Sequence, residues 1–552
     1  MQSRLGTPFS VAKELDMYIN SYDSHHNINY IEKGVEELCQ VIKSDPVIKK
    51  ILGSSWKYIE DVLSKNKNLK DSDSIVRINF VIGEILKKTN EYEVFILKEL
   101  KRILFEERDL SKFKTIYSEI DLYTGLYISL LVDKGFSFTY LYNRLNYLVS
   151  KRNYKKGTNF EQQFDSVFNK LSFEKSEYEV FFKVYNIDNF EYIEEAFKKE
   201  NWSLVKEVSD DILKKFPKNH FTGEYYIRIS VLASDYLAAT FTAKKIIDKK
   251  LDLMLYTSKA HLDIYENCVV YYKFKALKHI YEVNVSKELE KLYVEESLYT
   301  SRNGIYNFSN VIDKLMHADQ KQIQQSFRYM RLTRKTFSNE QKIINLWIAL
   351  ESLFYWKNGS KILTILTNYI PKFYSHLSIN SRLDLALKFV HELEEKILEK
   401  DNKELDHKDL LDIFLNKNDD VAKKIYNLIE SDIKKYRYSQ IRETFIDVQS
   451  INKQIKNTEV DVERQLRRIY FLRNKISHTG FYADINPILS IHLMDYIQMC
   501  YSIIYKGLNE FNVLDEKKAN FFDMFTINLM KYEETQLKSI ENKNFQIGVI
   551  NT

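Results

Sequence analysis

One arginine and one histidine near the carboxyl end of the chain have types and spacing that suit phosphate chemistry. Arg473 and His478 lie five positions apart in the sequence RNKISHTG, and no other arginine in the chain precedes a histidine at that spacing. A planar guanidinium binds phosphate oxygens in pairs, and an imidazole, with an ordinary pKa of ~6.5, transfers protons near neutral pH. Random placement would produce such a pair about as often as not, so the spacing alone identifies no function.

These two side chains suit cleavage of RNA without a metal ion. RNA carries its own nucleophile, the 2′-hydroxyl, so a ribonuclease needs only a general acid–base group and a cation that stabilises the charge growing on phosphorus. His478 suits the first task and Arg473 the second. The sequence contains no phosphate-binding glycine loop, dinucleotide-binding signature, metalloprotease motif or acidic metal cluster, and we expect no metal or other cofactor.

The pair lies on a predicted helix whose apolar stripe surrounds the arginine. At ~100° per residue, four apolar positions fall within roughly 80° of one another, and Arg473 projects into the middle of them. These four are Val462, Leu466, Ile469 and Ile476. Gly480 is the expected helix stop, because glycine adopts the left-handed cap conformation without strain. His478 is then in the last turn, where the helix dipole favours a protonated imidazole.

A second predicted helix supplies a partner for this cation. Its apolar face is formed by four large side chains, Ile343, Trp347, Leu350 and Phe354. Glu351 lies at the edge of that face. Because an unpaired buried charge costs several kcal/mol, we expect Glu351 to pair with Arg473 and so to join the two helices. The alternative is an exposed glutamate at the edge of a helical bundle.

Together the two segments resemble the HEPN superfamily, and within it the ApeA-like branch. The sequence IINLWIALESLF, with the pattern W-x-A-L-E-x-L, precedes the pattern R-N-x-I-x-H-x-G, and the resemblance covers roughly residues 340–510. The segment between them, about 360–460, is long for a minimal HEPN bundle, which predicts inserted helices. The resemblance implies a metal-independent RNA endonuclease that leaves 2′,3′-cyclic phosphate ends. It also implies a toxin or effector role in growth arrest or antiviral (abortive-infection) defence, with tRNA or other structured RNA as targets.

The resemblance also implies a homodimer. On a regular helix, five residues leave Arg473 and His478 about 140° apart, so one chain alone does not aim both at one phosphate. HEPN proteins bring two such motifs into one cleft between subunits, and a twofold interface would account for an arginine inside an apolar seam. Asn474, four residues before His478, is expected to orient the imidazole or a phosphate.

Further cations are candidates for RNA binding. Three of them flank the motif and would supply attraction for the substrate: Arg467, Arg468 and Lys475. Three more lie at i, i+3 and i+6 just before the tryptophan-containing helix and form a cationic strip: Arg328, Arg331 and Arg334. The alternative for this strip is a solvated helix face without a ligand.

The composition predicts a mainly α-helical protein. Glycine (13) and proline (5) are scarce among the 552 residues, and a hydrophobic content of 44% is ample for packed cores. A net charge of +5 is mild for this length, so an RNA-binding surface must come from local clustering. The three cysteines lie far apart, and no segment reaches the ~20 apolar residues of a membrane span, which favours a cytoplasmic protein without membrane attachment.

Four regions are predicted along the chain. Residues 1–187 form a mostly helical region, in which periodicity favours one helix over 31–51 and alternation predicts a small β element near 178–186. Residues 188–300 form a region of helical repeats. Residues 301–512 form the HEPN-like helical domain, and residues 513–552 form a carboxyl-terminal helix and tail.

The second of these regions resembles tetratricopeptide repeats. Asn201–Val205 and Asp235–Ala239 are offset by 34 positions, and the isoleucine pair at 246–247 follows Ile212 and Leu213 at the same offset. Paired helices of this kind bury their faces by stacking on one another, and their concave side binds a peptide or another protein. A protein trigger, such as one from a phage, is the partner expected there; the alternative is helical packing without a ligand.

Two other functions are open from the sequence. The HEPN-like bundle can be a non-catalytic oligomerisation or nucleotide-binding module, with the repeats acting as the sensor or interaction scaffold. The whole chain can also be a structural component of a larger complex. Activity that survives substitution of Arg473 and His478 would favour either of these over the ribonuclease.

Overall fold

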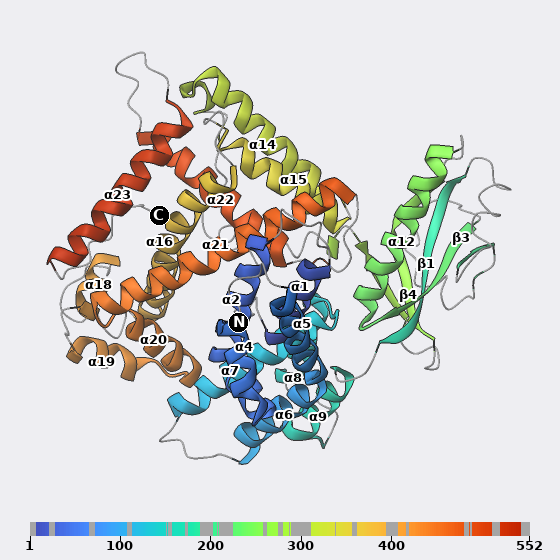
Figure 1. Ribbon diagram of the computed structural model, residues 1–552, viewed down its shortest axis with the longest axis horizontal. Helices are drawn as coiled ribbons and strands as arrows, with labels where there is room; N and C mark the ends of the chain where they lie inside the picture. The colour runs from blue at the N-terminus through green and yellow to red at the C-terminus, as the bar shows by residue number, and fades with distance from the viewer. Residues whose placement is uncertain are drawn as a thin grey trace. The chain divides into compact units, whose positions relative to one another are not determined.

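The fold is mainly α-helical with one five-stranded antiparallel sheet, as the sequence predicts. The computed structural model divides into two compact units, residues 1–285 and 286–552, which are described separately (Figure 1). The residues that the structure describes are 7–20, 28–65, 72–106, 113–150, 152, 157–171, 175–187, 202–206, 208, 225–257, 262–273, 280–285, 287–288, 308, 311–336, 338–355, 362–393, 407–415, 419–479, 485, 488–510 and 519–542.

The first unit begins with a layer of helices. They are α1 (Pro8–Asn20), α2 (Ile28–Ser44), α3 (Pro46–Leu52), α4 (Ser55–Lys65), α5 (Ser72–Lys87), α6 (Thr89–Lys101, extended by a π-helical turn over Arg102–Glu106), α7 (Phe113–Asp133), α8 (Phe138–Val149) and α9 (Phe160–Leu171). The single helix predicted over 31–51 is broken between α2 and α3. There the Asp45 side chain accepts hydrogen bonds from the backbone N–H groups of Val47 and Ile48, and Pro46 takes the first helical position.

The sheet of the first unit has the order β2-β3-β1-β4-β5, with all neighbours antiparallel. Its strands are β1 (Ser176–Ile187), β2 (Trp202–Val205), β3 (Tyr225–Ala233), β4 (Leu262–Tyr272) and β5 (Ile280–Asn284). In the central strand β1, Val180, Phe182 and Val184 are buried on one face of the sheet. Phe181 on the opposite face is buried too, in a cluster with Tyr226 and Val269, so both faces of the sheet are covered at its centre. The helix α12 (Tyr236–Thr257) packs along the sheet (Figure 1).

Two predictions for the middle of the chain are therefore wrong. In the described part of 188–300, strands β2 to β5 and the single helix α12 replace the predicted helical repeats. The offset of 34 positions relates strand β2 to the start of α12, while Ile212, Leu213 and Pro217 lie outside the described residues. The predicted boundary at 187/188 is also wrong, because it falls inside the sheet. Strand β1 precedes the boundary in the chain, but it is paired with β3 and β4, which follow it, so 188–285 is not a domain of its own.

A buried carboxylate connects the helices of the first unit to its sheet. Asp235 begins α12 and accepts hydrogen bonds from the backbone N–H groups of Leu237 (2.8 Å) and Ala238 (2.9 Å). The same side chain accepts hydrogen bonds from the backbone N–H (2.7 Å) and the hydroxyl (3.0 Å) of Ser137, which is itself the N-cap of α8. Burial raises the pKa of Asp235 to about 6.

The second unit is helical in the residues described. Its helices are α14 (His317–Lys335), α15 (Asn339–Ser352), α16 (Ile362–His391), α18 (His407–Leu415), α19 (Asp419–Leu428), α20 (Asp432–Thr444), α21 (Val448–Thr479), α22 (Ile488–Glu510) and α23 (Phe521–Asn542). The predicted region 513–552 is not separate, because the ring of Phe525 in α23 stacks on Phe354 after α15 at a centroid distance of 4.7 Å.

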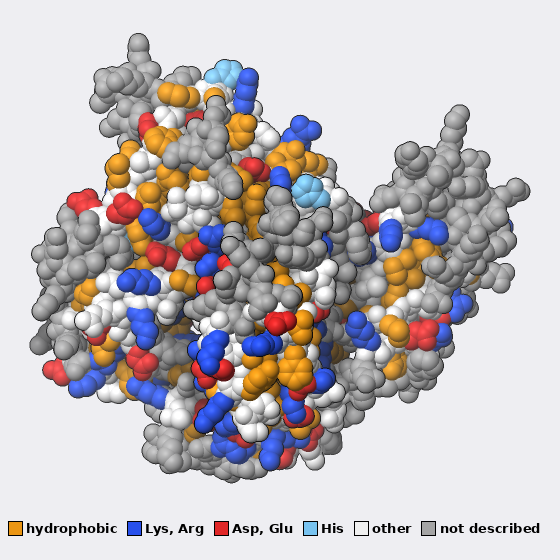
Figure 2. Space-filling model, viewed as in Figure 1, with side chains coloured by type: hydrophobic (Ala, Val, Ile, Leu, Met, Phe, Trp, Pro, Cys, Tyr) orange, Lys and Arg blue, Asp and Glu red, His pale blue; other side chains and the backbone are white. Residues whose placement is uncertain are grey.

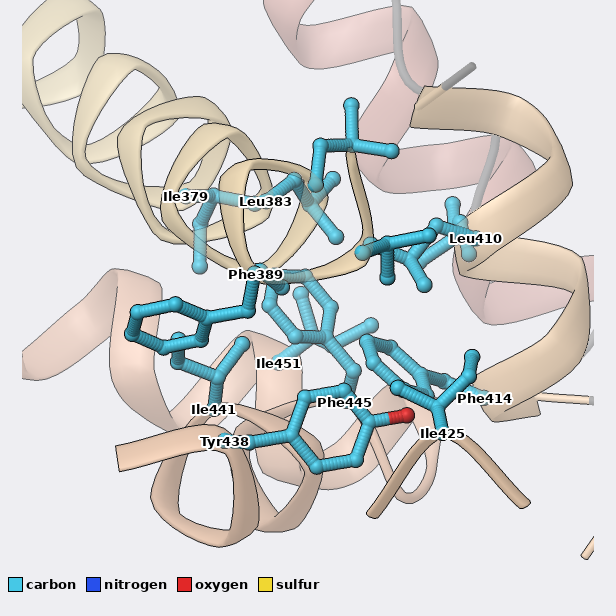
Figure 3. Packing of buried hydrophobic residues seen from close by; sticks show 14 of the residues in the cluster. Ile379, Leu383, Phe389, Leu410, Phe414, Ile425, Tyr438, Ile441, Phe445 and Ile451 are labelled. Atoms are coloured by element: carbon cyan, nitrogen blue, oxygen red, sulfur yellow. The ribbon is translucent and has the colours of Figure 1, made fainter. Parts of the chain in front are cut away.

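Helices α18 to α20 lie in the segment between α15 and α21. They pack against the second half of α16 and the start of α21 and form an apolar core of their own. Figure 3 shows this core, in which Leu383 of α16, Leu410 and Phe414 of α18, Phe445 at the end of α20 and Ile451 of α21 are buried together. The second half of α21 contacts α15, where Trp347 packs against Tyr470, and α22, where Tyr496 donates to Gln465.

Candidate active site

The candidate site lies at the carboxyl end of α21, a helix of 32 residues. The four predicted stripe residues, Val462, Leu466, Ile469 and Ile476, are all at most 3% exposed. Arg473 lies on the same stripe, and its side chain is 30% exposed, so the guanidinium is at the rim of the seam. The helix ends at Thr479, directly before Gly480, which itself lies outside the described residues.

The tryptophan-containing helix α15 brings an acid to this arginine. Trp347 is fully buried and its ring lies 5.4 Å from that of Tyr470 on α21, which fixes one helix against the other. One turn further along α15, a carboxylate oxygen of Glu351 is 3.8 Å from a terminal nitrogen of Arg473. The pair predicted from the sequence is therefore present.

Among the described residues, the partners of Arg473 occupy only part of its hydrogen-bond donors. A distance of 3.8 Å is longer than a hydrogen bond, so Glu351 offsets the charge of the guanidinium without occupying its donor fork. The other terminal nitrogen donates to the side-chain oxygen of Asn474 at 3.0 Å. The Nε atom of Arg473 is buried and has no hydrogen-bond partner in the described part of the chain. The terminal nitrogens of such a guanidinium can donate hydrogen bonds to the oxygens of a bound phosphate.

His478 lies in the last turn of α21 and is exposed to solvent. Asn474, which was expected to orient this imidazole or a phosphate, instead directs its side-chain oxygen to Arg473. Five residues of helix separate Arg473 from His478, which corresponds to about 140° of rotation and about 7.5 Å of rise. Within one chain the two groups therefore point in different directions.

The other cations predicted to bind RNA differ in exposure and in pairing. Arg467 donates to Glu463 at 2.7 and 2.9 Å, so its charge is offset by a neighbour one turn away. Arg468 is only 7% exposed and is not available to a polynucleotide, which corrects its assignment as an RNA contact. Lys475 is half-buried. By contrast, the three arginines of α14 are all exposed: Arg328, Arg331 and Arg334.

A polar layer inside the second unit was not predicted. The hydroxyl of Tyr496 on α22 donates to the side-chain oxygen of Gln465 on α21, and its ring lies 5.2 Å from that of Tyr374 on α16. His492, one turn before Tyr496, is half-buried with both ring nitrogens enclosed, and burial together with the charge of Arg468 lowers the pKa of its imidazole to about 4. The helical period of α22 would have indicated this burial, because His492 shares a face with the apolar side chains of its helix.

Metal ligands and membrane spans were searched for across the residues that the structure describes. No three histidine, cysteine, aspartate or glutamate side chains there are grouped as a metal site would require. No described helix combines the length and the apolar character needed to cross a membrane. Comparisons with models of known protein families, with curated proteins and with solved structures find no match to this chain.

Proposed function

We propose that the second unit is a metal-independent RNA endonuclease of the HEPN type, in which Arg473 and His478 carry the reaction. The observation that supports this most directly is the state of Arg473. It lies in an apolar seam, beside Glu351 at 3.8 Å, with a fork of donors that the described residues do not fill. A structural arginine at such a position would be expected to form close hydrogen bonds to its acid.

The proposed chemistry uses the hydroxyl that RNA itself provides. The imidazole of His478 accepts the proton of the 2′-hydroxyl, whose oxygen then bonds to the neighbouring phosphorus. The bond from phosphorus to the 5′-oxygen breaks, and that oxygen takes up a proton from a histidine or from water. The products are a 2′,3′-cyclic phosphate and a 5′-hydroxyl. The guanidinium of Arg473 stabilises the negative charge that develops on the phosphate oxygens.

The active form in this proposal is a homodimer. Arg473 and His478 of one chain are about 140° apart around α21, so one phosphate would be reached by the arginine of one copy and the histidine of the other. The exposed position of His478 and the partly exposed position of Arg473 leave both side chains accessible from the surface of one copy.

The test is cleavage of total RNA in the presence of a metal chelator, with the cut ends identified. We expect cyclic phosphate ends from the parent and a loss of about 10²–10³-fold in rate for His478→Ala and for Arg473→Ala. Ser477→Ala and Lys456→Ala, which alter exposed side chains of the same helix, are matched controls and should cut at the parental rate. Undiminished cleavage by both site variants would refute the assignment and favour a non-catalytic scaffold.

We propose further that this cleavage acts as a toxin or effector in antiviral defence or growth arrest. A ribonuclease of broad specificity stops translation when it is active. Expression of the parent in bacteria should then slow growth, and expression of His478→Ala should not. Equal growth of the two strains, with equal amounts of protein, would contradict this role.

A further inference from the structure

The helix α14 carries a run of cations that no acid interrupts. From Gln320 to Lys335 the sequence contains no aspartate or glutamate and five cations: Lys321, Arg328, Arg331, Arg334 and Lys335. Their charge of +5 equals the net charge of the whole chain, 82 cations less 77 acids, so acids and cations balance over the remainder. Figure 2 shows that mixture on the visible face, where Lys or Arg and Asp or Glu side chains are interspersed. The run on α14 is therefore a local excess of positive charge.

The three arginines of this run are exposed and have no acidic partner. None of Arg328, Arg331 and Arg334 forms an ion pair within the ranges that the structure describes. The one acid of α14, Asp319, lies near the other end of the helix and accepts a hydrogen bond from the backbone N–H of Phe521 at 2.8 Å. The arginines thus differ from Arg467, whose charge is offset by Glu463.

The opposite face of α14 is fixed to the rest of the unit. The Ser326 hydroxyl is buried and donates to the backbone carbonyl of Ala349 at 2.7 Å, and it lies 2.7 Å from the hydroxyl of Tyr501. Ile323 and Thr333 on the same side are fully buried. Because the helix is held in place, a ligand on its outer face orders only the side chains that contact it, which lowers the entropic cost of binding.

The spacing of the arginines suits a chain of phosphates. At about 1.5 Å and 100° per residue, successive arginines at i, i+3 and i+6 are about 4.5 Å apart along the helix and about 60° apart around it. Each guanidinium can therefore contact a different phosphate of one strand. Leu332 is the one exposed large apolar residue of α14, which gives little surface for insertion into lipid. The chemistry of this face favours nucleic acid over a membrane.

We propose that Arg328, Arg331 and Arg334 form a docking strip that binds the phosphate backbone of RNA independently of sequence. The strip is distinct from the catalytic pair, and it deepens the proposed function, on which it rests in taking RNA as the substrate. It holds the polynucleotide by charge, whereas Arg473 and His478 act on one phosphodiester.

The experiment measures binding rather than cleavage. The full chain with His478→Ala is titrated against a labelled single-stranded RNA of about 20 nucleotides at several salt concentrations. Each phosphate contact contributes about 0.7 to the slope of log affinity against log salt, so Arg328→Gln with Arg331→Gln and Arg334→Gln should lower that slope by about 2. We expect an affinity loss of about tenfold at low salt that becomes smaller as salt is raised.

Two matched triple variants complete the test. Replacing the same three arginines by lysine keeps the charge and should keep the salt slope. The second variant removes three exposed cations of the first unit by substitution with glutamine, at Lys57, Arg77 and Lys98. It loses the same charge as the α14 variant, but we expect it to keep the parental salt slope. An unchanged slope in the α14 glutamine variant, an equal loss in the first-unit variant, or binding of anionic lipid vesicles in place of RNA would each overturn the proposal.

The outcome is separable from that of the catalytic assignment. RNA binding through α14 by a chain that never cuts RNA would support the docking strip and refute the ribonuclease. If replacing the α14 arginines changes neither the RNA affinity nor the cleavage rate, the docking strip is refuted and the ribonuclease is supported.

Discussion

Two histidines with enclosed ring nitrogens, His376 and His492, should make the second unit less stable in mild acid. Burial lowers the pKa of His376 and of His492 to about 4, and the charge of Arg468 adds to the effect at His492. An unfolded chain binds a proton on each ring below a pH of ~6.5. Between the two values the unfolded state therefore binds more protons than the folded state. Stability is complete above the unfolded pKa and is lost as the pH falls toward the folded one.

The size of the effect follows from the two pKa values. A difference of ~2.5 units corresponds to about 3 kcal/mol per histidine below both values, and to about 2 kcal/mol at pH 5. The surroundings of the rings support values of this order. The ring of His376 packs edge-on against Tyr532 at a centroid distance of 4.4 Å. Its Nε2 atom and both ring nitrogens of His492 have no hydrogen-bond partner among the described residues, so no hydrogen bond offsets lost hydration.

The assay compares urea unfolding of the parent, His376→Gln and His492→Gln at pH 8 and pH 5. Glutamine does not titrate, so each variant should lose about 2 kcal/mol less than the parent between the two conditions. The substitution itself also changes the free energy of unfolding, but by the same amount at both pH values. This change cancels when the difference between pH 8 and pH 5 is taken for each protein. His317→Gln, which alters an exposed histidine at the start of α14, should retain the pH dependence of the parent.

One result would refute this reasoning. If His376→Gln and His492→Gln lose as much stability between pH 8 and pH 5 as the parent does, the folded rings take up protons as readily as unfolded ones. Their burial would then carry no proton-linked energy, and the polar layer around His492 would have to be open to water.

Two further predictions concern carboxylates in the two units. Because burial raises the pKa of Asp235 to about 6, the folded state binds the proton more tightly than the unfolded one. The first unit should lose about 2 kcal/mol as the pH rises from 4 to 6, a loss absent from Asp235→Asn in urea unfolding. Glu351→Gln should change the free energy of unfolding by less than about 1 kcal/mol, because the pair with Arg473 is long and partly exposed. A loss above about 3 kcal/mol would show instead that the pair is buried.

The parts of the site that could be predicted depend on a single helix at a time. The placing of Arg473 in an apolar seam follows from a period of 3.6 residues over α21, and the pairing with Glu351 follows from the cost of an uncompensated charge. Both inferences need only local geometry and one energetic rule. For the same reason α15 and α22 could be located from their apolar faces alone.

The error at Arg468 has a different physical origin. A stripe argument assumes that a helix buries one face and exposes the other. The helix α21 packs against α15, α16 and α20, so a second face is also covered and Arg468 becomes buried on it. The sequence shows that residue 468 is charged, but the number of helices that pack against α21 cannot be read from it.

The sheet could not be predicted because its pairing is not local. In β3, Ile227, Ile229 and Val231 alternate as a strand should, but the strand is paired with β1, which lies more than 40 residues earlier in the chain. A search for helical periods instead found the offset of 34 positions. The two segments related by that offset have similar residue types, but one forms strand β2 and the other begins helix α12. Similar residue types therefore did not produce the same secondary structure.

The helix α21 extends through two buried regions of the second unit, and its packing there determines the position of the candidate site at its end. Ile451 and Ile455 near its start are buried in the core formed with α16 and α18 to α20, whereas Ile469 and Ile476 near its end are buried in the part where Tyr470 packs against Trp347 of α15. Because a helix of 32 residues is held at both of these places, its last turn has a fixed direction although His478 itself is exposed. An imidazole on a fixed but exposed helix end can meet a substrate presented by a second copy, which a buried or loosely held histidine cannot do.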